Sequence, residues 1–398
     1  MSANLARQFL LREDVVFLNH GSFGACPRPV FEAYQRFQLE LESEPVEFLG
    51  RRLNDLMRTP REALAAELGT AQDNIAAVTN ATGGLNIVAR SLPLKPGDQI
   101  LTTDHEYSAL EKTWAFICRQ TGAEVVVVKV PLPLTSEAAF TDAIVAGMTA
   151  RTRVLFLSHI TSPTALLFPI ENSVAEARRR GIWSVIDGAH TPGHIPLDLD
   201  ALGADFYSGN CHKWMMTPKG SAFLYARPDV QRLVDPLVVS HGWTAGSKEP
   251  GAKGAFGNSP FIDEIEMQGT RDPSAWLALP EAIRFRQEND WPSVAGHCAQ
   301  LAQDTARRLG ELTGLPSLST PEFSAPQMVA MPIPQCDAPE IHKTLFDRYR
   351  IEIPVFKWQD TCIARVSVQG YNSRPQMDRL IAALSELLDL GTPQRAHG

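Results

Sequence analysis

Two side chains of opposite charge stand out in the segment from Ile182 to Gly220. Asp187 ends an apolar, β-branched run, and Lys213 follows His212 toward the end of the segment. If the segment folds as a strand, a connection and a second strand, both charges lie at the ends of neighbouring strands. Ligands of open α/β sheets bind at this edge of the sheet. An acid that faces an amine there is either a structural ion pair or the two ends of a cofactor site.

Lys213 is the candidate nucleophile. An amine in a partly desolvated site near positive charge has a lowered pKa and can form a Schiff base with a carbonyl group. The pair His-Lys alone is a weak signal, and a surface lysine is the alternative. If the carbonyl compound is pyridoxal phosphate, Asp187 would keep its ring nitrogen protonated and make the ring an electron sink. His190 could then reach the ring oxygen or the substrate, although a capping or core histidine fits the sequence equally well.

A phosphate group would need its own site, and the run VTNATGGLN at 78–86 offers one. A strand ends there and Thr82 and Gly83 open a helix, so that free backbone N–H groups and the positive end of the helix dipole point at one spot. A plain strand-to-helix turn is the alternative, because the run is neither a Walker loop nor GxGxxG. The missing GxGxxG also argues against a nicotinamide dehydrogenase.

Three more residues have side chains that suit such a site. His105 follows a strand in TTDHEY and could stack on a pyridine ring with Tyr107 nearby, whereas an exposed loop histidine is the alternative. Arg365 is a cation inside the apolar strand CIARVSV. A buried arginine needs a partner, which is either a substrate carboxylate held by two parallel hydrogen bonds or an acidic residue of the chain.

Short β-rich runs alternate with longer amphipathic runs, which predicts βαβ units and a mainly parallel sheet. The expected strands of this sheet are 75–79, 99–103, 124–130, 154–158, 183–186, 206–208 and 222–225. The expected helices between them are 83–91, 109–120, 137–147 and 172–180.

The two ends of the chain have a different organisation. Before the sheet, a loop at 19–24 precedes helical spacing from 28 to 57, interrupted at Pro45, and a second helical run at 61–68. A glycine-rich loop follows the sheet at 238–260, and loops of this length are usually functional or disordered. The remaining expected elements are helices at 272–284, 292–312, 339–349 and 374–388 and strands at 328–333, 351–355 and 363–368. We therefore expect an N-terminal arm (1–25), a large domain (26–275) and a smaller α+β domain (276–398).

The composition is that of an ordinary soluble enzyme. The chain has 398 residues, of which 44% are hydrophobic and 21% charged, and its net charge of −8 argues against a nucleic-acid surface. No run approaches the roughly 18 apolar residues of a membrane span, and the N-terminus lacks the pattern of a signal peptide. Six scattered cysteines without CxxC spacing argue against a metal site or a disulfide framework. We expect a cytoplasmic protein with reduced thiols.

Taken together, these residues resemble the class V aminotransferase family of fold-type I pyridoxal-phosphate enzymes, and within it the isopenicillin N epimerase group. The resemblance covers nearly the whole chain, in order. It rests on LNHGSFG (18–24), EPVEFLGR (44–51), TNATGGLN (79–86), DHEY (104–107), LSHITSPTAL (157–166), DGAHTPG (187–193), HKW (212–214), QGTRD (268–272) and RVSVQGYN (365–372).

This resemblance implies a role for each matching residue. Lys213 would carry the cofactor as a Schiff base and move the α-proton, Asp187 would pair with the ring nitrogen, and His105 would stack on the ring. The remaining cofactor contacts would come from Thr82, Gly83, Ser162, His190, Asn210 and His212, with Thr270 reaching the phosphate in the partner subunit of a homodimer. Arg365 would bind the substrate carboxylate, with Asn19 and Tyr107 beside it.

The chain departs from the family pattern at two positions. Asn210 stands where relatives usually have a serine that binds phosphate, and Ala165 stands where they often have glycine. Cysteine desulfurases need a nucleophilic cysteine on a loop before the arginine strand, but PVFKWQDT has none.

The shared first step expected is removal of the α-proton of an amino acid. Reprotonation from the opposite face would give epimerisation, loss of a β-substituent would give a lyase, and reprotonation on the cofactor would give transamination. Epimerisation needs a second acid, for which Tyr107, His190 and His241 are the candidates. A non-catalytic pyridoxal-phosphate-binding protein is a further alternative.

Overall fold

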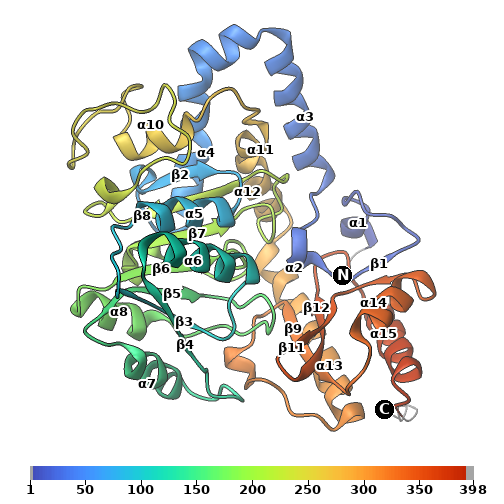
Figure 1. The fold of residues 1–398 in the computed structure, drawn as a ribbon. Helices are drawn as coiled ribbons and strands as arrows, with labels where there is room; N and C mark the ends of the chain where they lie inside the picture. Colours follow the sequence, from blue (N-terminus) through green and yellow to red (C-terminus); the bar gives the residue numbers. More distant parts are fainter. Residues whose placement is uncertain (1–2, 391–398) are drawn as a thin grey trace.

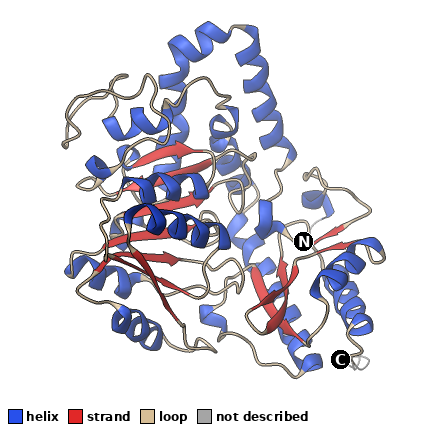
Figure 2. Ribbon diagram, in the orientation of Figure 1, coloured by secondary structure: helices blue, strands red, loops and turns tan. Residues whose placement is uncertain are grey.

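The computed structural model describes residues 3–390 and has two layered regions (Figure 1, Figure 2). The strands are β1 (Val16–Phe17), β2 (Ile75–Val78), β3 (Gln99–Thr103), β4 (Glu124–Val128), β5 (Thr152–Ser158), β6 (Trp183–Gly188), β7 (Phe206–Asn210), β8 (Ala222–Ala226), β9 (Met328–Ile333), β10 (Ile351–Glu352), β11 (Val355–Trp358) and β12 (Thr361–Ser367). The α-helices are α1 (Ala3–Ala6), α2 (His20–Phe23), α3 (Arg28–Ser43), α4 (Leu53–Glu67), α5 (Ala81–Ser91), α6 (Ser108–Thr121), α7 (Glu137–Gly147), α8 (Glu171–Arg179), α9 (Leu199–Leu202), α10 (Pro260–Glu266), α11 (Ser274–Leu277), α12 (Leu279–Glu288), α13 (Trp291–Thr313), α14 (Ala338–Asp347) and α15 (Arg374–Leu387). Among the described residues, no helix is both long and apolar enough to cross a membrane.

The larger region is built on a seven-stranded sheet in the order β2-β8-β7-β6-β5-β3-β4. Neighbouring strands from β4 to β7 run parallel, and β8 is antiparallel to both β7 and β2. All seven strands expected from the sequence are present, which confirms the α/β class and the mainly parallel sheet. The parallel arrangement brings the ends of β3, β5, β6 and β7 to one edge.

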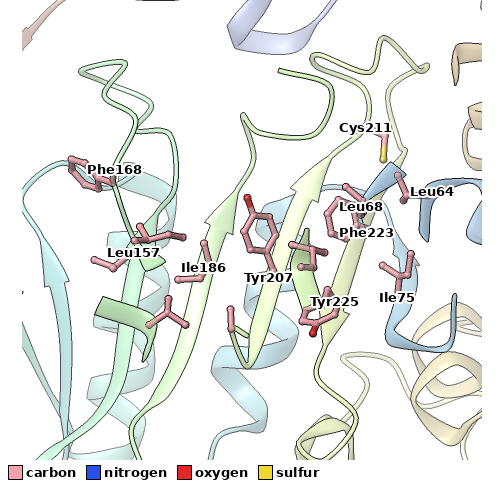
Figure 3. Close-up of a cluster of buried hydrophobic side chains, with 14 of the residues drawn as sticks. Leu64, Leu68, Ile75, Leu157, Phe168, Ile186, Tyr207, Cys211, Phe223 and Tyr225 are labelled. Atoms are coloured by element: carbon pink, nitrogen blue, oxygen red, sulfur yellow. The ribbon is translucent and has the colours of Figure 1, made fainter. Parts of the chain in front are cut away.

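Both faces of this sheet are covered, which explains the continuous apolar runs in its strands. Along β5, Val154 and Phe156 belong to one buried cluster, and Leu155 and Leu157 belong to the other. The first cluster packs under α5, α6 and α10, and the second under α4, α7 and α8. Figure 3 shows part of the second cluster, with Tyr207 and other labelled side chains lying across neighbouring strands. The strand ends are therefore held by a core on each side.

The smaller region combines the C-terminal part of the chain with its N-terminal segment. β9, β12 and β11 form an antiparallel sheet, and the two-residue strand β1 pairs in parallel with β10. Figure 1 shows the N-terminal segment beside α14 and β12. The single strand expected at 351–355 is instead divided into β10 and β11 at Pro354, whose ring nitrogen cannot donate a ladder hydrogen bond. We propose that the small domain begins near residue 276, with the N-terminal arm packed on it.

Three details near the N-terminus differ from the sequence-based expectation. The expected loop at 19–24 contains the short helix α2. After Pro45 the chain continues as a π-helix, Val46–Arg52, and α4 begins at Leu53 rather than at Arg61. Pro60 lies inside α4, where tertiary packing outweighs its local cost.

Ala165, one departure from the family pattern, lies in a turn with a left-handed backbone conformation. Ala165 is buried and has a φ of 52°, in the left-handed region that favours glycine. Its carbonyl accepts a hydrogen bond from the Ala325 N–H at 2.9 Å, which ties the turn to the smaller region. The glycine often found here in relatives therefore suits the backbone better than alanine does.

Candidate active site

One cavity of about 970 Å³ lies at the carboxyl ends of the parallel strands, between the large sheet and the arm. It gathers most of the residues singled out from the sequence. These are Thr82, Tyr107, Ser162, Asp187, His190, Asn210, His212, Lys213 and Arg365. Four other candidates, Asn19, Gly83, His105 and Thr270, do not line it.

Lys213 lies in the irregular turn after β7, inside this cavity. Its Nζ is 3.0 Å from His190 Nε2, and the charge of Arg365 acts on it. Burial first, and the Arg365 charge second, lower the pKa of Lys213 to about 7, against the opposing effect of Asp187. A large fraction of Lys213 is therefore a neutral, nucleophilic amine near pH 7.

His190 is neutral and holds the Lys213 amine. Burial, followed by the Lys213 charge, lowers its pKa well below the ordinary value. Because an ammonium group only donates, His190 Nε2 accepts while Lys213 is charged, and the imidazole proton then sits on Nδ1. That buried Nδ1 has no hydrogen-bond partner among the described residues. It is free to contact a bound group.

Asp187 ends β6 without a basic partner. No Lys, Arg or His nitrogen of the described residues lies within 4.0 Å of it, and its Oδ1 accepts a hydrogen bond from the Ala189 N–H at 2.8 Å. Burial raises its pKa to about 6, although the Ala189 N–H and the Lys213 charge lower it. The direct ion pair between Asp187 and Lys213, one alternative from the sequence, is therefore not formed among the described residues.

The N-terminus of α5 forms one end of the cavity. Asn210 Oδ1 accepts from the Ala81 N–H at 2.8 Å, and Asn80 Oδ1 accepts from the Gly83 N–H at 2.7 Å. Among the described residues, the Thr82 N–H and hydroxyl have no hydrogen-bond partner, and both belong to the cavity wall. Thr82, and not Gly83, is thus the residue of this turn with free donors, because Asn80 already caps Gly83.

Asn210 and His212 complete this end. Since Asn210 uses its oxygen to cap α5, its amide N–H₂ is left to face the cavity. His212 Nδ1 lies 3.3 Å from the Ser221 carbonyl, which directs the other ring nitrogen away from that strand. Because burial lowers the pKa of His212 to about 4, the neutral ring gives its one proton to that carbonyl, and the donors that suit a phosphate group are the Asn210 amide and the helix N-terminus.

Arg365 lies at the opposite end, on β12, and is 5% exposed. Its guanidinium donates to the Ser22 hydroxyl at 3.0 Å and to the Ser162 carbonyl and hydroxyl, and its Nε has no partner. No carboxylate of the described residues lies within 4.0 Å, which excludes the acidic partner considered from the sequence. Burial lowers its pKa to about 10, so Arg365 stays charged and open to a carboxylate ligand.

Asn19 acts one step away from the cavity. Its Oδ1 accepts a hydrogen bond of 2.5 Å from Ser22, whose hydroxyl in turn accepts from Arg365. Its amide donates to Glu352 Oε1 at 3.3 Å. Asn19 therefore contacts Ser22 and does not line the cavity itself.

His105 does not face the cavity in this structure, which differs from the stacking role expected for it. Its Nδ1 is 2.7 Å from Thr164 Oγ1, and its ring packs against Trp358 at a centroid distance of 4.5 Å. Burial lowers its pKa to about 4, so it is neutral. Successive side chains of the turn point in different directions, and the following residue, Glu106, is the one anchored toward the cavity.

Glu106 was missed by the sequence analysis, although it belongs to the DHEY motif. Its carboxyl group is 5% exposed, lines the cavity and accepts hydrogen bonds from Thr103 Oγ1 (2.7 Å), Ser158 N (2.9 Å) and Ser158 Oγ (2.6 Å). Ser158 is the register partner of Asp187 across β5 and β6, so the two carboxyl groups lie on adjacent strand ends. Burial raises the pKa of Glu106 to about 8, and the Asp187 charge adds to this rise.

Thr270 and His241 lie together in a separate cavity of about 330 Å³, next to residues of the EPVEFLGR motif. Neither residue lines the cavity that holds Lys213. Within one chain, His241 is therefore not placed to act as the second acid. Thr270 could serve a pyridoxal-phosphate site only in another subunit.

The residues present fit pyridoxal phosphate. The carboxylate of Asp187 lacks a cation, the free donors of Thr82 suit a phosphate, and Lys213 is a buried amine between them. The sequence matches the family model described as aminotransferase class V over residues 16–380. The chain belongs to the class V aminotransferase family. It is a pyridoxal-phosphate-dependent enzyme of fold-type I.

Relatives within the family have different activities. Isopenicillin N epimerase of Streptomyces clavuligerus is 36% identical over 384 residues, covering 96% of each chain. L-cysteine desulfhydrase of Arabidopsis thaliana is 28% identical, covering 94% of this chain and 88% of its own. A solved structure of a C-DES variant with glycine linked covalently to the cofactor has a TM-score of 0.80 at 24% identity, covering 97% of this chain and 99% of that one. This last likeness concerns the fold.

Proposed function

We propose that this enzyme inverts the α-carbon of an amino acid or of an amino-acid-derived substrate, as an epimerase similar to isopenicillin N epimerase. The observation that carries the proposal is the amine of Lys213, which lies 3.0 Å from His190 and is readily neutral. It shares the cavity with Asp187 and Arg365, neither of which has an ion-pair partner among the described residues. The 36–37% identity to two isopenicillin N epimerases over 96–97% of the chain supports the choice of epimerisation.

The cofactor, when bound, condenses with amines and withdraws electrons from the substrate α-carbon. The residues of the chain supply the rest. Arg365 binds the substrate carboxylate, and Asp187 provides the negative charge that a protonated pyridine ring needs beside it. Lys213, with a pKa near the working pH, takes the α-proton as a general base.

A second acid must protonate the α-carbon from the face opposite Lys213. His190 contacts the Lys213 amine directly and so lies on the Lys213 side, and His241 lies in another cavity. Tyr107 lines the catalytic cavity from the β3–α6 turn and is 43% exposed. We assign the second acid to Tyr107.

We also propose a cytoplasmic homodimer in which Thr270 of each subunit reaches the phosphate bound by the other. The placement of Thr270 outside the catalytic cavity of its own chain supports this arrangement. Cys26, Cys118, Cys211, Cys336 and Cys362 form no disulfide among the described residues, as is usual in a reducing compartment. None of them lines the catalytic cavity, which argues against cysteine desulfurase activity.

The experiment is to incubate the holoenzyme in D₂O with L-alanine, L-glutamate, L-cysteine and peptide-linked amino acids that keep a free α-amino acid end. The α-deuterium content, the chirality, the keto acid and the sulfide are measured together. Deuterium uptake with inversion is expected, and Lys213→Ala should abolish both. Sulfide and pyruvate release with retained chirality would instead establish a C–S lyase, the activity of the desulfhydrase relatives.

A further inference from the structure

The short helix α2 is wedged between the turn that carries Lys213 and the strand that carries Arg365. A Cβ atom on Gly24, which has a φ of 71°, would lie 1.9 Å from the His212 carbonyl oxygen. A Cβ atom on Gly21 would lie 2.7 Å from Ser367 Oγ on β12. Glycine at 24 is required for the close approach to the Lys213 turn, and glycine at 21 lets α2 approach β12 without displacing the Ser367 side chain.

His20, the first residue of α2, binds the main chain of Lys213. Its Nε2 lies 3.0 Å from the Lys213 carbonyl oxygen, and its Nδ1 lies 3.0 Å from the Tyr371 hydroxyl. His20 is fully buried, and burial lowers its pKa to about 3, so the ring is neutral and carries one proton. A proton on Nε2 lets the ring donate to Lys213 and accept from Tyr371.

The other tautomer is disfavoured by the same contacts. Gln369 Nε2 lies 3.2 Å from His20 Nε2 and could donate to it only if that nitrogen carried no proton. In that case, the Nε2 lone pair would face the Lys213 carbonyl oxygen at 3.0 Å, which is repulsive. The Lys213 carbonyl oxygen therefore sets the tautomer, and the Tyr371 hydroxyl supports it by donating to Nδ1.

Ser22, two residues further along, binds the side chain of Arg365. Its hydroxyl accepts from Arg365 Nη2 at 3.0 Å and donates to Asn19 Oδ1 at 2.5 Å. Since Asn19 fixes the direction of the Ser22 proton, the Ser22 lone pairs face the guanidinium. One helix of four residues thus contacts both the main chain of Lys213 and the side chain of Arg365.

We propose that α2 is a positioning element of the active site, in which His20 fixes the main chain of Lys213 and Ser22 fixes the guanidinium of Arg365. This inference rests on the proposed roles of Lys213 as base and Arg365 as carboxylate ligand. The two contacts act on different stages of the reaction. Loss of the His20 contact misplaces the base after the substrate has bound, and loss of the Ser22 contact weakens binding of the substrate carboxylate.

The test compares α-deuterium uptake by L-alanine, L-glutamate and L-cysteine in His20→Leu, Tyr371→Phe and Ser22→Ala holoenzymes. Uptake reports the step shared by epimerase and lyase, so it does not depend on the outcome of the reaction. We expect His20→Leu to lower kcat about a hundredfold with little change in KM, because small misplacements of a catalytic group have large effects. Tyr371→Phe keeps the ring and should lower kcat in the same direction, by about tenfold. Ser22→Ala should raise KM about tenfold with little change in kcat.

Two matched variants control for the loss of a buried hydroxyl elsewhere. Tyr225→Phe removes a phenol that donates to Asp200 at 3.3 Å, and Ser385→Ala removes a hydroxyl in α15. Both should leave kcat and KM unchanged. If His20→Leu does not fold, Tyr371→Phe alone decides the role of His20. Equal effects on kcat and KM in the α2 variants, or no effect of Tyr371→Phe on kcat, would overturn the proposal.

Hydrogen exchange gives a readout that does not depend on activity. The Met216 N–H donates to the Lys213 carbonyl at 3.1 Å, beside His20. In the full chain without cofactor, amides of residues 211–217 should exchange about three- to tenfold faster in His20→Leu and at the wild-type rate in Ser22→Ala. If neither these three amino acids nor the peptide-linked amino acids named above take up deuterium, the proposed function fails, and the exchange rates still decide whether His20 holds Lys213. An unchanged rate in His20→Leu would refute that contact.

Discussion

Replacing Glu106 with glutamine removes the charge of a buried carboxyl group and keeps its shape. In the folded protein, the pKa of Glu106 is raised from 4.5 to about 8, first by burial and also by the charge of Asp187. The three donors to its oxygens can serve a glutamine as well, because the Thr103 hydroxyl can rotate to accept from the new amide. Glu106→Gln therefore tests the charge and leaves the packing unchanged.

The sign and size of the effect follow from proton linkage. Because the folded state binds the proton more tightly, stability falls as pH rises from about 4.5 and levels off above about 8. The pKa difference corresponds to about 3 to 5 kcal/mol over this window. The Glu106→Gln variant cannot ionise, so it should match the wild type near pH 5 and exceed its stability by up to this amount at pH 9.

The assay is urea unfolding of the cofactor-free protein at one fixed protein concentration, from pH 5 to pH 9. Fixed concentration matters because subunit association would shift the midpoint. Subtracting the free energies of unfolding of the two proteins at each pH removes the contributions of the other titrating groups. Glu124→Gln, at an exposed position on β4, serves as the control. Parallel pH dependences for wild type and Glu106→Gln would refute the assignment of a buried, proton-binding Glu106.

Three other predictions concern the ends of the cavity. The rate at which Lys213 of the cofactor-free protein captures pyridoxal phosphate should rise with pH and level off above about 7, the pKa of its amine. The rate is measured from the visible absorbance in a stopped-flow instrument. A rate that still rises at pH 9 would contradict the lowered pKa of Lys213. Arg365→Gln should raise KM for the amino acid about a hundredfold or more and should also move the capture profile to higher pH, because the Arg365 charge lowers the pKa of Lys213. Asn210→Ala leaves the Ala81 N–H without its acceptor and should lower the free energy of unfolding by about 1–3 kcal/mol, measured in urea; an unchanged midpoint would show that water replaces the Asn210 oxygen.

The fold was largely predictable because strong local signals and the global architecture agree. Strands such as β5 and β6 are continuous apolar runs ended by polar residues, and parallel topology then brings Ser158 and Asp187 to one edge. The elements that were missed depend on long-range pairing. β1 has two residues and pairs with β10, more than 300 positions away, which no local pattern can indicate.

The direction of a side chain at the candidate site was predictable where the residue lies on a strand. It was not predictable where the residue lies in a turn. Asp187 and Arg365 are strand residues, whose side chains alternate between the faces of a sheet. His105 and Glu106 are neighbours in a turn, and the hydrogen bonds of Glu106 to Ser158 decide which of them faces the cavity. The role of Ser22 was likewise hidden, because it depends on a contact with β12 across the fold.

The pKa shifts of the cavity residues indicate which charges a bound cofactor and substrate would supply. Burial moves the pKa of Asp187 up to about 6, and those of Lys213 and Arg365 down to about 7 and about 10, so each group is shifted toward its neutral form. Such shifts mean that each charge lacks a close partner of opposite sign. In the proposed function, pyridoxal phosphate and an amino acid would supply partners for these groups, a ring cation for Asp187 and a carboxylate for Arg365, and Lys213 would be the residue that holds the cofactor. In the proposed function, binding of the cofactor and the substrate would therefore relieve part of the unfavourable electrostatics that burial imposes on these three groups.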